Sequence, residues 1–177
     1  PGWAFGMPEL APGQRAAIRS AKRISNPGCH ASAFILLLRP LVDAGLLSPE
    51  QAVTATSITG YSGGGKALIE RFEADPDIAF RAYGLALGHK HVPEMMTHTG
   101  LTVPPIFQPV VSSFYKGLAV SVPLHLSQLR AGTTPQQVQE ALAAHYAGER
   151  FVTVQALSDP ATLADGFFNV QANNDSN

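Results

Sequence analysis

The chain has 177 residues, of which 45% are hydrophobic, a formal charge of −1 and a single cysteine. Its twelve basic residues form no run, so we expect no nucleic-acid partner, and its longest apolar run, AFILLL, is far shorter than the roughly 20 residues of a membrane helix. One cysteine cannot form an internal disulfide and no signal peptide opens the chain, so we expect a soluble, cytoplasmic protein without membrane contact, with a single domain at residues 1–177.

The first elements lead toward the cysteine. PGWAFGMPEL at the start predicts an ordered loop or the tail of a linker, because two prolines and two glycines lie among aromatic residues. Residues 23–25 predict a brief strand that runs to the cysteine. Between them, residues 12–22 predict a short helix with an inward face made of Ala16, Ala17, Ile18 and Ala21.

The clearest helix begins near Cys29 and ends near Gly45, the usual stop residue. Asn26 suits the N-cap and Pro27 suits the first helical position. Apolar residues recur at steps of three and four and predict one buried face: Phe34, Leu37, Leu38, Leu41 and Val42. The sequence therefore predicts Cys29 in the first turn of an anchored helix.

A thiol in that position is a candidate nucleophile. Free backbone N–H groups and the positive end of the helix dipole favour the thiolate, which is the reactive form of cysteine. Gly28 would leave room for a substrate close to the backbone, which a core-filling cysteine does not need. The alternative is that Cys29 is a small buried residue without chemistry, since free cysteines are often buried.

Residues 52–59 alternate and are rich in Val, Ile and Thr, so they predict a strand that runs into GYSGGGK. A helix is predicted over residues 66–73, so the glycine turn lies between a strand and a helix and could bind an anion. The candidate groups are Ser62, Gly63, Gly64, Lys66 and Arg71. The spacing is not that of a P-loop, and a flexible connection is the alternative.

Residues 80–87 predict another strand, and Pro93 with Glu94 predicts the start of a short helix that ends at Gly100. Glu94 could orient a histidine, or it could be a first-turn carboxylate stabilised by the helix dipole.

Between that strand and that helix lie His89 and His91. At most one of these two side chains is expected to face a given site. The alternative is one surface histidine and one hydrogen-bonded packing histidine. No metal site is predicted, because no further ligand set is recognisable and His98 is out of phase.

The middle of the chain is rich in β-branched and aromatic residues. Residues 106–114 and 118–126 predict two strands joined as a hairpin or meander by a turn at residues 115–117. Pro109 and Pro123 predict sheet edges or bulges there.

The remaining elements complete the prediction. Residues 134–146 predict a helix capped by Thr134, residues 151–155 a strand, and residues 167–172 the last strand. We therefore expect an α+β (α/β) fold: a mixed, mostly antiparallel sheet with helices packed on one face and the other face used for pairing with another subunit.

Three motifs in this order, SNPGC before a helix, SITGYSGGG, and YGLALGHKHVPE, resemble those of the N-acetyl-gamma-glutamyl-phosphate reductase family, in particular the shorter of its two sequence types. The likeness covers nearly the whole chain and extends to PLHL, HYAGERFVTV and ANNDSN. Semialdehyde dehydrogenases share a cysteine that opens a helix, but not the HKHVPE segment. The resemblance implies a fold like the C-terminal catalytic domain of glyceraldehyde-3-phosphate and semialdehyde dehydrogenases.

The resemblance also implies an enzyme of arginine biosynthesis that reduces N-acetyl-L-glutamyl 5-phosphate to N-acetyl-L-glutamate 5-semialdehyde with NADPH. Family members carry an NADP-binding Rossmann domain before the PGW segment and a return segment at the end, and neither is found here. We therefore expect a catalytic and dimerisation domain that forms a dimer or tetramer, that has the missing nucleotide-binding domain as a partner, and that alone binds no NADP(H) and shows little or no reductase activity.

The resemblance and the local chemistry agree on Cys29 as the nucleophile that forms a thioester with an acyl phosphate. The general base is His91 or His89; we favour His91, because it adjoins the start of a helix, and expect His89 to hold the substrate. The expected substrate contacts are Asn26, Gly28, Ser62, Gly63, Gly64, Lys66 and Glu94.

The residue after the cysteine departs from the family pattern. The family usually has an aromatic residue there, mostly tyrosine, and threonine two positions further on, where this chain has His30 and Ser32. His30 either lies beside the thiol and changes its ionisation or replaces a packing ring; we favour the second.

Two other classes of function remain open from the sequence. One is a different thiol-dependent enzyme, such as a semialdehyde dehydrogenase-like domain or a cysteine hydrolase that works without a dinucleotide. The other is a non-catalytic oligomerisation scaffold, because the strand-rich middle section needs a cover for its exposed face.

Overall fold

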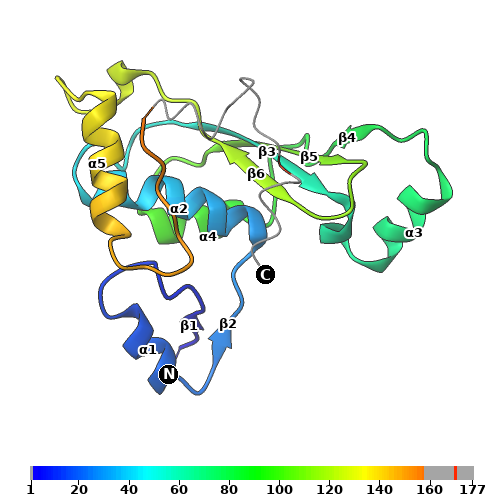
Figure 1. Ribbon diagram of the computed structural model, residues 1–177, viewed down its shortest axis with the longest axis horizontal. Coiled ribbons are helices and arrows are strands. Elements are labelled where there is room, and N and C mark those ends of the chain that lie inside the picture. Colours follow the sequence, from blue (N-terminus) through cyan, green and yellow to red (C-terminus); the bar gives the residue numbers. More distant parts are fainter. Residues whose placement is uncertain (1, 158–169, 171–177) are drawn as a thin grey trace.

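The computed structural model describes residues 2–157 and residue 170, and its centre is a four-stranded mixed sheet (Figure 1). The strand order is β4-β5-β3-β6, made of Phe80–Ala82 (β4), Ile106–Ser112 (β5), Thr54–Gly60 (β3) and Leu118–Ser121 (β6). β3 and β5 are parallel, whereas β4 and β6 pair antiparallel to their neighbours. The predicted mixed, mostly antiparallel sheet is confirmed.

Helices α2 (Cys29–Asp43) and α4 (Val92–Thr99) lie against one face of this sheet, and α5 (Pro135–His145) packs beside α2 (Figure 1). Helix α2 packs against β6, α4 and α5. Their contact forms a core of large side chains that are at most 1% exposed: Phe34, Ile35, Leu38, Met95 and Phe107. The opposite sheet face carries the exposed residues of the alternating strands, among them Ile58 at 41% and Ile106 at 47%. The helices that cover the sheet therefore lie on one face of it, as predicted, whereas α1 (Gln14–Ser20) and α3 (Lys66–Ala74) lie elsewhere.

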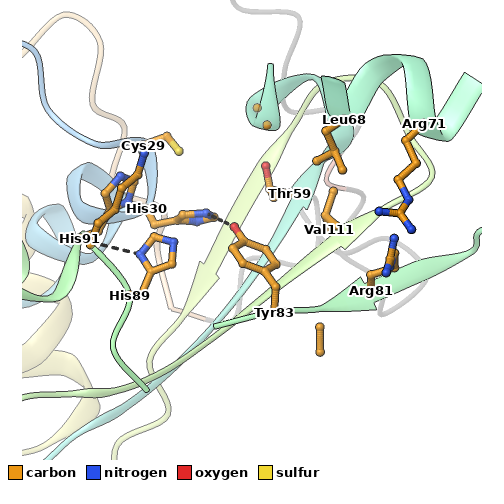
Figure 2. A pocket seen from close by; sticks show the side chains of 14 residues that line it. Cys29, His30, Thr59, Leu68, Arg71, Arg81, Tyr83, His89, His91 and Val111 are labelled. Atoms are coloured by element: carbon orange, nitrogen blue, oxygen red, sulfur yellow. Dashed lines mark hydrogen bonds between the residues drawn. The ribbon is translucent and has the colours of Figure 1, made fainter. Parts of the chain in front are cut away.

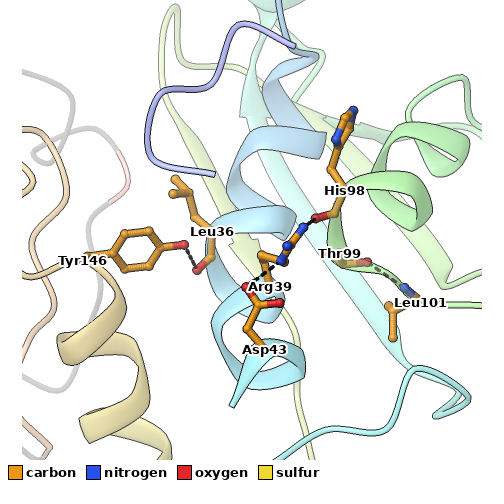
Figure 3. A network of polar contacts seen from close by, with 7 residues as sticks. All are labelled: Leu36, Arg39, Asp43, His98, Thr99, Leu101 and Tyr146. Carbon is orange, nitrogen blue, oxygen red and sulfur yellow. Dashed lines mark hydrogen bonds and ion pairs between the residues drawn. The ribbon is translucent and has the colours of Figure 1, made fainter. Parts of the chain in front are cut away.

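Polar contacts hold the two outer helices to α2 (Figure 3). Tyr146 donates its hydroxyl hydrogen to Leu36 O at 2.8 Å, and burial raises the pKa of this phenol. On the other side, Arg39 donates to His98 O at 3.0 Å and pairs with Asp43 at 2.7 Å. These contacts fix α2, and with it the position of Cys29.

Helix α2 begins later than predicted. Its N-cap is Gly28 and no side chain caps it, so the N-cap prediction for Asn26 is wrong and Pro27 lies outside the helix. Instead, Glu94 accepts the Gly28 N–H at 2.9 Å. The predicted stop is confirmed, because Gly45 directly follows the C-cap and has a φ of 63°.

The predicted hairpin of residues 106–126 is wrong, because β3 lies between β5 and β6. The connection from β5 to β6 crosses the end of β3, where Gly60 N donates to Gly117 O at 2.8 Å. A Cβ at Gly60 would lie 2.6 Å from Tyr115 O, so only glycine permits this crossing. Strand pairing here depends on β3, whose residues pair with β5 residues 52 positions later, and no local turn signal reveals this.

Pro109 lies in an inner strand, so the predicted edge or bulge is wrong there. Its carbonyl accepts Tyr83 N at 3.0 Å just past the end of β4, so its missing N–H removes only the terminal bond of that ladder. Pro123 lies two residues after β6, which is an edge strand.

The shorter elements differ from the prediction in several places. β4 ends at Ala82, because Gly84 (φ 64°) and Leu87 (φ 59°) turn the chain. Helix α1 (Gln14–Ser20) buries no residue and connects β1 (Ala4–Phe5) to β2 (Ile24–Ser25), so the predicted inward face is wrong while the brief strand is confirmed.

Near the end of the described residues, the segment 151–155 is not a strand, and Phe151 is 79% exposed. The predicted strand at residues 167–172 lies outside the described residues, apart from residue 170.

Helices α3 (Lys66–Ala74), α4 and α5 are confirmed, including the Thr134 cap. The short turn η1 (Tyr61–Gly64) links β3 to α3, and a second one, η2 (Leu126–Gln128), precedes α5. Within residues 2–157, no helix is both long and apolar enough to span a membrane.

Candidate active site

A cavity of about 490 Å³ opens where the N-terminus of α2 meets the end of the sheet and the loop before α4. Figure 2 shows that its two ends differ in chemistry. Cys29 and three imidazoles, His30, His89 and His91, gather at one end. At the other end the side chains of Arg71 and Arg81 approach each other. The cavity thus joins a thiol and imidazoles at one end to guanidinium groups at the other.

Cys29 is exposed and is the first residue of α2. The first intrahelical hydrogen bond runs from Ser32 N to Gly28 O at 2.8 Å. The N–H groups of the first turn before Ser32 have no partner within the helix, as at every uncapped helix start. The thiol therefore lies beside backbone donors that are free to bind a negatively charged group of a ligand.

His91 packs directly on the residue before the cysteine. A Cβ at Gly28 would lie 2.7 Å from Cε1 of His91 and closer still to Nε2. The space that glycine leaves is therefore filled by the imidazole, and the interpretation that Gly28 leaves room for a substrate is wrong. His91 Nδ1 is buried and has no hydrogen-bond partner among the described residues.

His89 and His91 both line the cavity, so the expectation that at most one faces it is wrong. The expectation fails because side chains two residues apart lie on the same side even of an extended segment. In the structure residues 89–92 form a turn, with Val92 N bonded to His89 O at 2.9 Å. The rings lie edge to face with centroids 4.8 Å apart. His89 Nδ1 accepts the His91 N–H at 3.2 Å, which leaves the proton of a neutral His89 on Nε2.

Burial is the main cause that lowers the pKa of both histidines below 6.5. For His89, the neighbouring His91 and Lys90 lower the pKa further. For His91, the charge of Glu94 raises the pKa and so opposes the effect of burial, whereas the charge of Lys90 lowers the pKa further. Both imidazoles are therefore neutral at pH 7, and a neutral imidazole can accept a proton.

His30 points away from the thiol and into the sheet, at 3% exposure. Its Nδ1 lies 2.8 Å from Ser57 Oγ and its Nε2 lies 2.8 Å from the Tyr83 hydroxyl. Burial, with the charges of His91 and His89, lowers its pKa to about 4. Burial and the nearby Cys29 raise the pKa of Tyr83 to about 12.

The other candidate residues divide into two groups. Gly63 and Gly64 line the cavity. Ser62 does not, and its N–H is bonded to Tyr115 O at 2.9 Å; Lys66 is exposed and lies 3.7 Å from Glu70. Asn26 is exposed and also lies outside the lining.

The sequence analysis missed Arg81 and Tyr83. Arg81 pairs with Val111 in the register of β4 and β5, and Tyr83 follows two residues later, so both project to the cavity side of the sheet. The only sequence signal was the predicted strand that begins at residue 80, in which Arg81 and Tyr83 share one face; what that face contacts is not visible in the sequence.

The glycine turn between β3 and α3 does not form a dinucleotide-binding fold. α3 contacts η1 and lies beyond the end of the sheet instead of covering it (Figure 1). Among the described residues, no group of His, Cys, Asp and Glu could hold a metal ion. The features described so far define a mixed α/β domain with an accessible thiol at a helix N-terminus, beside neutral histidines.

Comparisons with known proteins agree with this class. The family model described as "Semialdehyde dehydrogenase, dimerisation domain" matches residues 29–173, and the chain belongs to this family. Aspartate semialdehyde dehydrogenase II from Vibrio cholerae has the same fold, with a TM-score of 0.57 and 21% identity over 79% of this chain and 48% of that one.

Curated relatives are closer in sequence. An N-acetyl-gamma-glutamyl-phosphate reductase from Trichormus variabilis is 43% identical over 94% of this chain and 54% of its own length. The reductase of the same name from Rhizobium etli is 48% identical over 93% of this chain and 54% of its own length. The chain thus spans about half the length of these relatives. Their names do not favour the hydrolase or scaffold alternatives.

Proposed function

We propose that residues 1–177 are the catalytic and dimerisation domain of an NADPH-dependent N-acetyl-gamma-glutamyl-phosphate reductase, which converts N-acetyl-L-glutamyl 5-phosphate to N-acetyl-L-glutamate 5-semialdehyde in arginine biosynthesis. The observation that carries the proposal is the position of Cys29, exposed at an uncapped helix start with His91 packed on Gly28. The reductase names of relatives at 43% and 48% identity support this substrate.

In the first step, the Cys29 sulfur attacks the acyl carbon of the substrate. A bond forms between sulfur and carbon, the bond from carbon to the phosphate oxygen breaks, and inorganic phosphate leaves with the electron pair. His91 accepts the thiol proton, because it is neutral at pH 7 and its Nε2 edge faces the backbone at Gly28. The product is a thioester on Cys29.

The rest of the cavity binds the substrate in this proposal. His89 donates its Nε2 proton to the carboxylate or acetamido group, and Arg71 with Arg81 attracts negative charge at the far end. Neither guanidinium has a carboxylate partner among the described residues. Gly63 and Gly64 bring the backbone close to the ligand, and Glu94 positions the start of α2 through Gly28. We assign no contact to Asn26, Ser62 or Lys66.

NADPH supplies the hydride that reduces the thioester when it is bound by the nucleotide-binding part of such an enzyme. The residues described here do not fit that role, because α3 does not pack on the sheet as the helix of a dinucleotide-binding unit does. The chemistry derived from them is the acyl-transfer half of the reaction.

The exposed sheet face supports pairing with a second copy of the chain. Ile58, Val110 and Ala119 are aligned across three strands, and Ile106 and the 66% exposed Phe80 extend the same apolar face. Sedimentation at high protein concentration tests the pairing: we expect a dimer or larger oligomer, and monomers alone would contradict it.

The reaction is tested in the reverse direction, in a protein that joins these residues to a nucleotide-binding domain. We expect NADP-dependent oxidation of N-acetylglutamate semialdehyde that requires inorganic phosphate and disappears in Cys29→Ala. Activity that survives Cys29→Ala would contradict the proposal, as would a reaction that ignores phosphate.

A further inference from the structure

The residue after Cys29 begins a buried chain of hydrogen bonds that runs from the sheet to the cavity. Ser57 of β3 lies 2.8 Å from His30 Nδ1, and His30 Nε2 lies 2.8 Å from the hydroxyl of Tyr83, which lines the cavity (Figure 2). Ser57 is completely buried, at 0% exposure. The chain therefore connects a residue with no access to solvent to one that faces the ligand space.

The direction of these hydrogen bonds follows from the burial of Ser57. A neutral imidazole has one donor and one acceptor nitrogen, so only one of the two hydroxyls can donate to His30. The pKa of about 4 keeps His30 neutral near pH 7. If His30 donated from Nδ1, the Ser57 hydroxyl hydrogen would have no acceptor, because Ser57 Oγ makes no other hydrogen bond among the described residues.

A buried donor without an acceptor is costly, whereas a donor that faces the cavity can bond to water or to a ligand. The favoured arrangement therefore has Ser57 donating to Nδ1, and Nε2–H donating to the Tyr83 oxygen. In that arrangement the Tyr83 hydrogen cannot point back to His30. It is left to point into the cavity that Tyr83 lines.

We infer that His30 is a positioning residue that makes Tyr83 a hydrogen-bond donor to an oxygen of the bound acyl phosphate. The inference rests on the proposed function and extends it to a group that does not itself touch the substrate. Negative charge develops on the oxygens of the acyl phosphate as Cys29 attacks, and a donor held in place beforehand stabilises that charge. A histidine that only fills the core would leave the hydroxyl of Tyr83 free to rotate.

Two substitutions of His30 separate the two hydrogen bonds. The amide of His30→Asn overlaps the Nδ1 position and can keep the bond to Ser57 but not to Tyr83. The amide of His30→Gln reaches the Nε2 position and can donate to Tyr83. Tyr83→Phe removes the hydroxyl, and Tyr115→Phe is a matched control, because Tyr115 is 52% exposed and lies outside the cavity.

The experiment measures the rate at which acetyl phosphate acylates Cys29 in the chain itself, and beside it the rate of alkylation by iodoacetamide. We expect His30→Asn and Tyr83→Phe each to slow acylation about tenfold, with no further loss in the double variant. His30→Gln should recover most of the rate, and Tyr115→Phe should match the unmodified chain. Alkylation should change less than about twofold throughout, because it needs the thiolate but no oxygen donor.

Additive losses in the double variant would overturn the inference, as would equal losses in acylation and alkylation, which indicate a disturbed thiol. If the unmodified chain is alkylated but not acylated, the proposed function fails and the inference fails with it. For variants that do not fold, nitrogen-15 NMR of the imidazole in the unmodified chain decides: a proton on Nε2 of His30 is expected, and a proton on Nδ1 would overturn the inference.

Discussion

The N-termini of α5 and α2 differ in how they are capped. At α5, Thr134 Oγ1 accepts Gln137 N at 3.3 Å, and the Gln137 side chain accepts the Thr134 N–H at 2.9 Å. At α2 the N-cap is Gly28, no side chain caps the helix, and the bond at this end comes from Glu94 of another helix. The side-chain hydrogen bonds at the start of α5 come from residues of the same helix end. The side-chain hydrogen bond at the start of α2 comes from a residue distant in sequence.

The first two residues of α5 and of α2 also differ in burial. Pro135 and Gln136 of α5 are exposed and contribute a fixed φ and polarity. In α2 the same positions hold the exposed Cys29 and His30, which is 3% exposed. The capping box of α5 stabilises a helix end that contributes nothing to the cavity. An end left uncapped, with a crowded glycine before it, leaves its N–H groups for a ligand.

The largest effect is expected from the thiol itself. Cys29→Ala removes the nucleophile, so we expect phosphate release from acetyl phosphate to fall by at least about 10³-fold. Measured in the same assay, Thr134→Ala should stay within about twofold of the unmodified chain, because α5 contributes no residue to the cavity. Equal losses in the two variants would remove the distinction between the helix ends.

Gly28→Ala should have the next largest effect, because its Cβ would displace the His91 ring. We expect acylation of Cys29 to fall about 100-fold, and the free energy of unfolding to fall by about 1–3 kcal/mol, from overpacking. Stopped-flow phosphate release and urea denaturation measure the two quantities. Gly88→Ala is the control, since a Cβ there meets nothing within 4 Å; similar losses in both variants would contradict the role of the contact.

His30, the buried second residue of α2, should make the stability of the domain depend on pH. The folded-state pKa of His30 is lowered to about 4 from 6.5. Between these values the unfolded chain binds a proton at this imidazole and the folded chain does not, so the free energy of unfolding should decrease as the pH is lowered through that window. Urea denaturation at pH 7 and pH 5 should show a smaller decrease in His30→Phe; an unchanged slope would contradict the assignment.

The smallest effect is expected at the capped end. Thr134→Ala removes the side-chain acceptor of α5 and should lower the free energy of unfolding by about 1 kcal/mol. Thermal or urea denaturation measures this loss, and the alkylation rate of Cys29 should not change. Restoration by Thr134→Ser would confirm that the cap causes the loss, whereas a change in Cys29 reactivity would show that the two ends are coupled.

Helix starts and ends that depend on neighbouring residues could be predicted from the sequence. The cap and Pro135 predicted α5, and Gly45 and Gly100 predicted the ends of α2 and α4. These signals are local: a left-handed glycine ends a helix, and a proline without an N–H suits its first turn, and each acts within one turn of helix.

Features that depend on distant segments could not be predicted in the same way. The insertion of β3 between β5 and β6, and the contact of His91 with Gly28, join residues more than 40 positions apart. The sequence indicates that Gly28 makes a close contact, but it does not reveal that the contact is with His91 and not with a substrate. Tyr83 was missed because its role comes from a partner, His30, on another element.

The central claim is that the open start of α2 makes Cys29 an acyl acceptor. Intact-mass spectrometry of the chain after mixing with N-acetyl-L-glutamyl 5-phosphate tests it most directly, because Cys29 is the only cysteine. We predict one N-acetylglutamyl group per chain, removable by hydroxylamine, with one equivalent of phosphate released and no adduct in Cys29→Ala. An unmodified mass, in a chain whose thiol still reacts with iodoacetamide, would contradict the account.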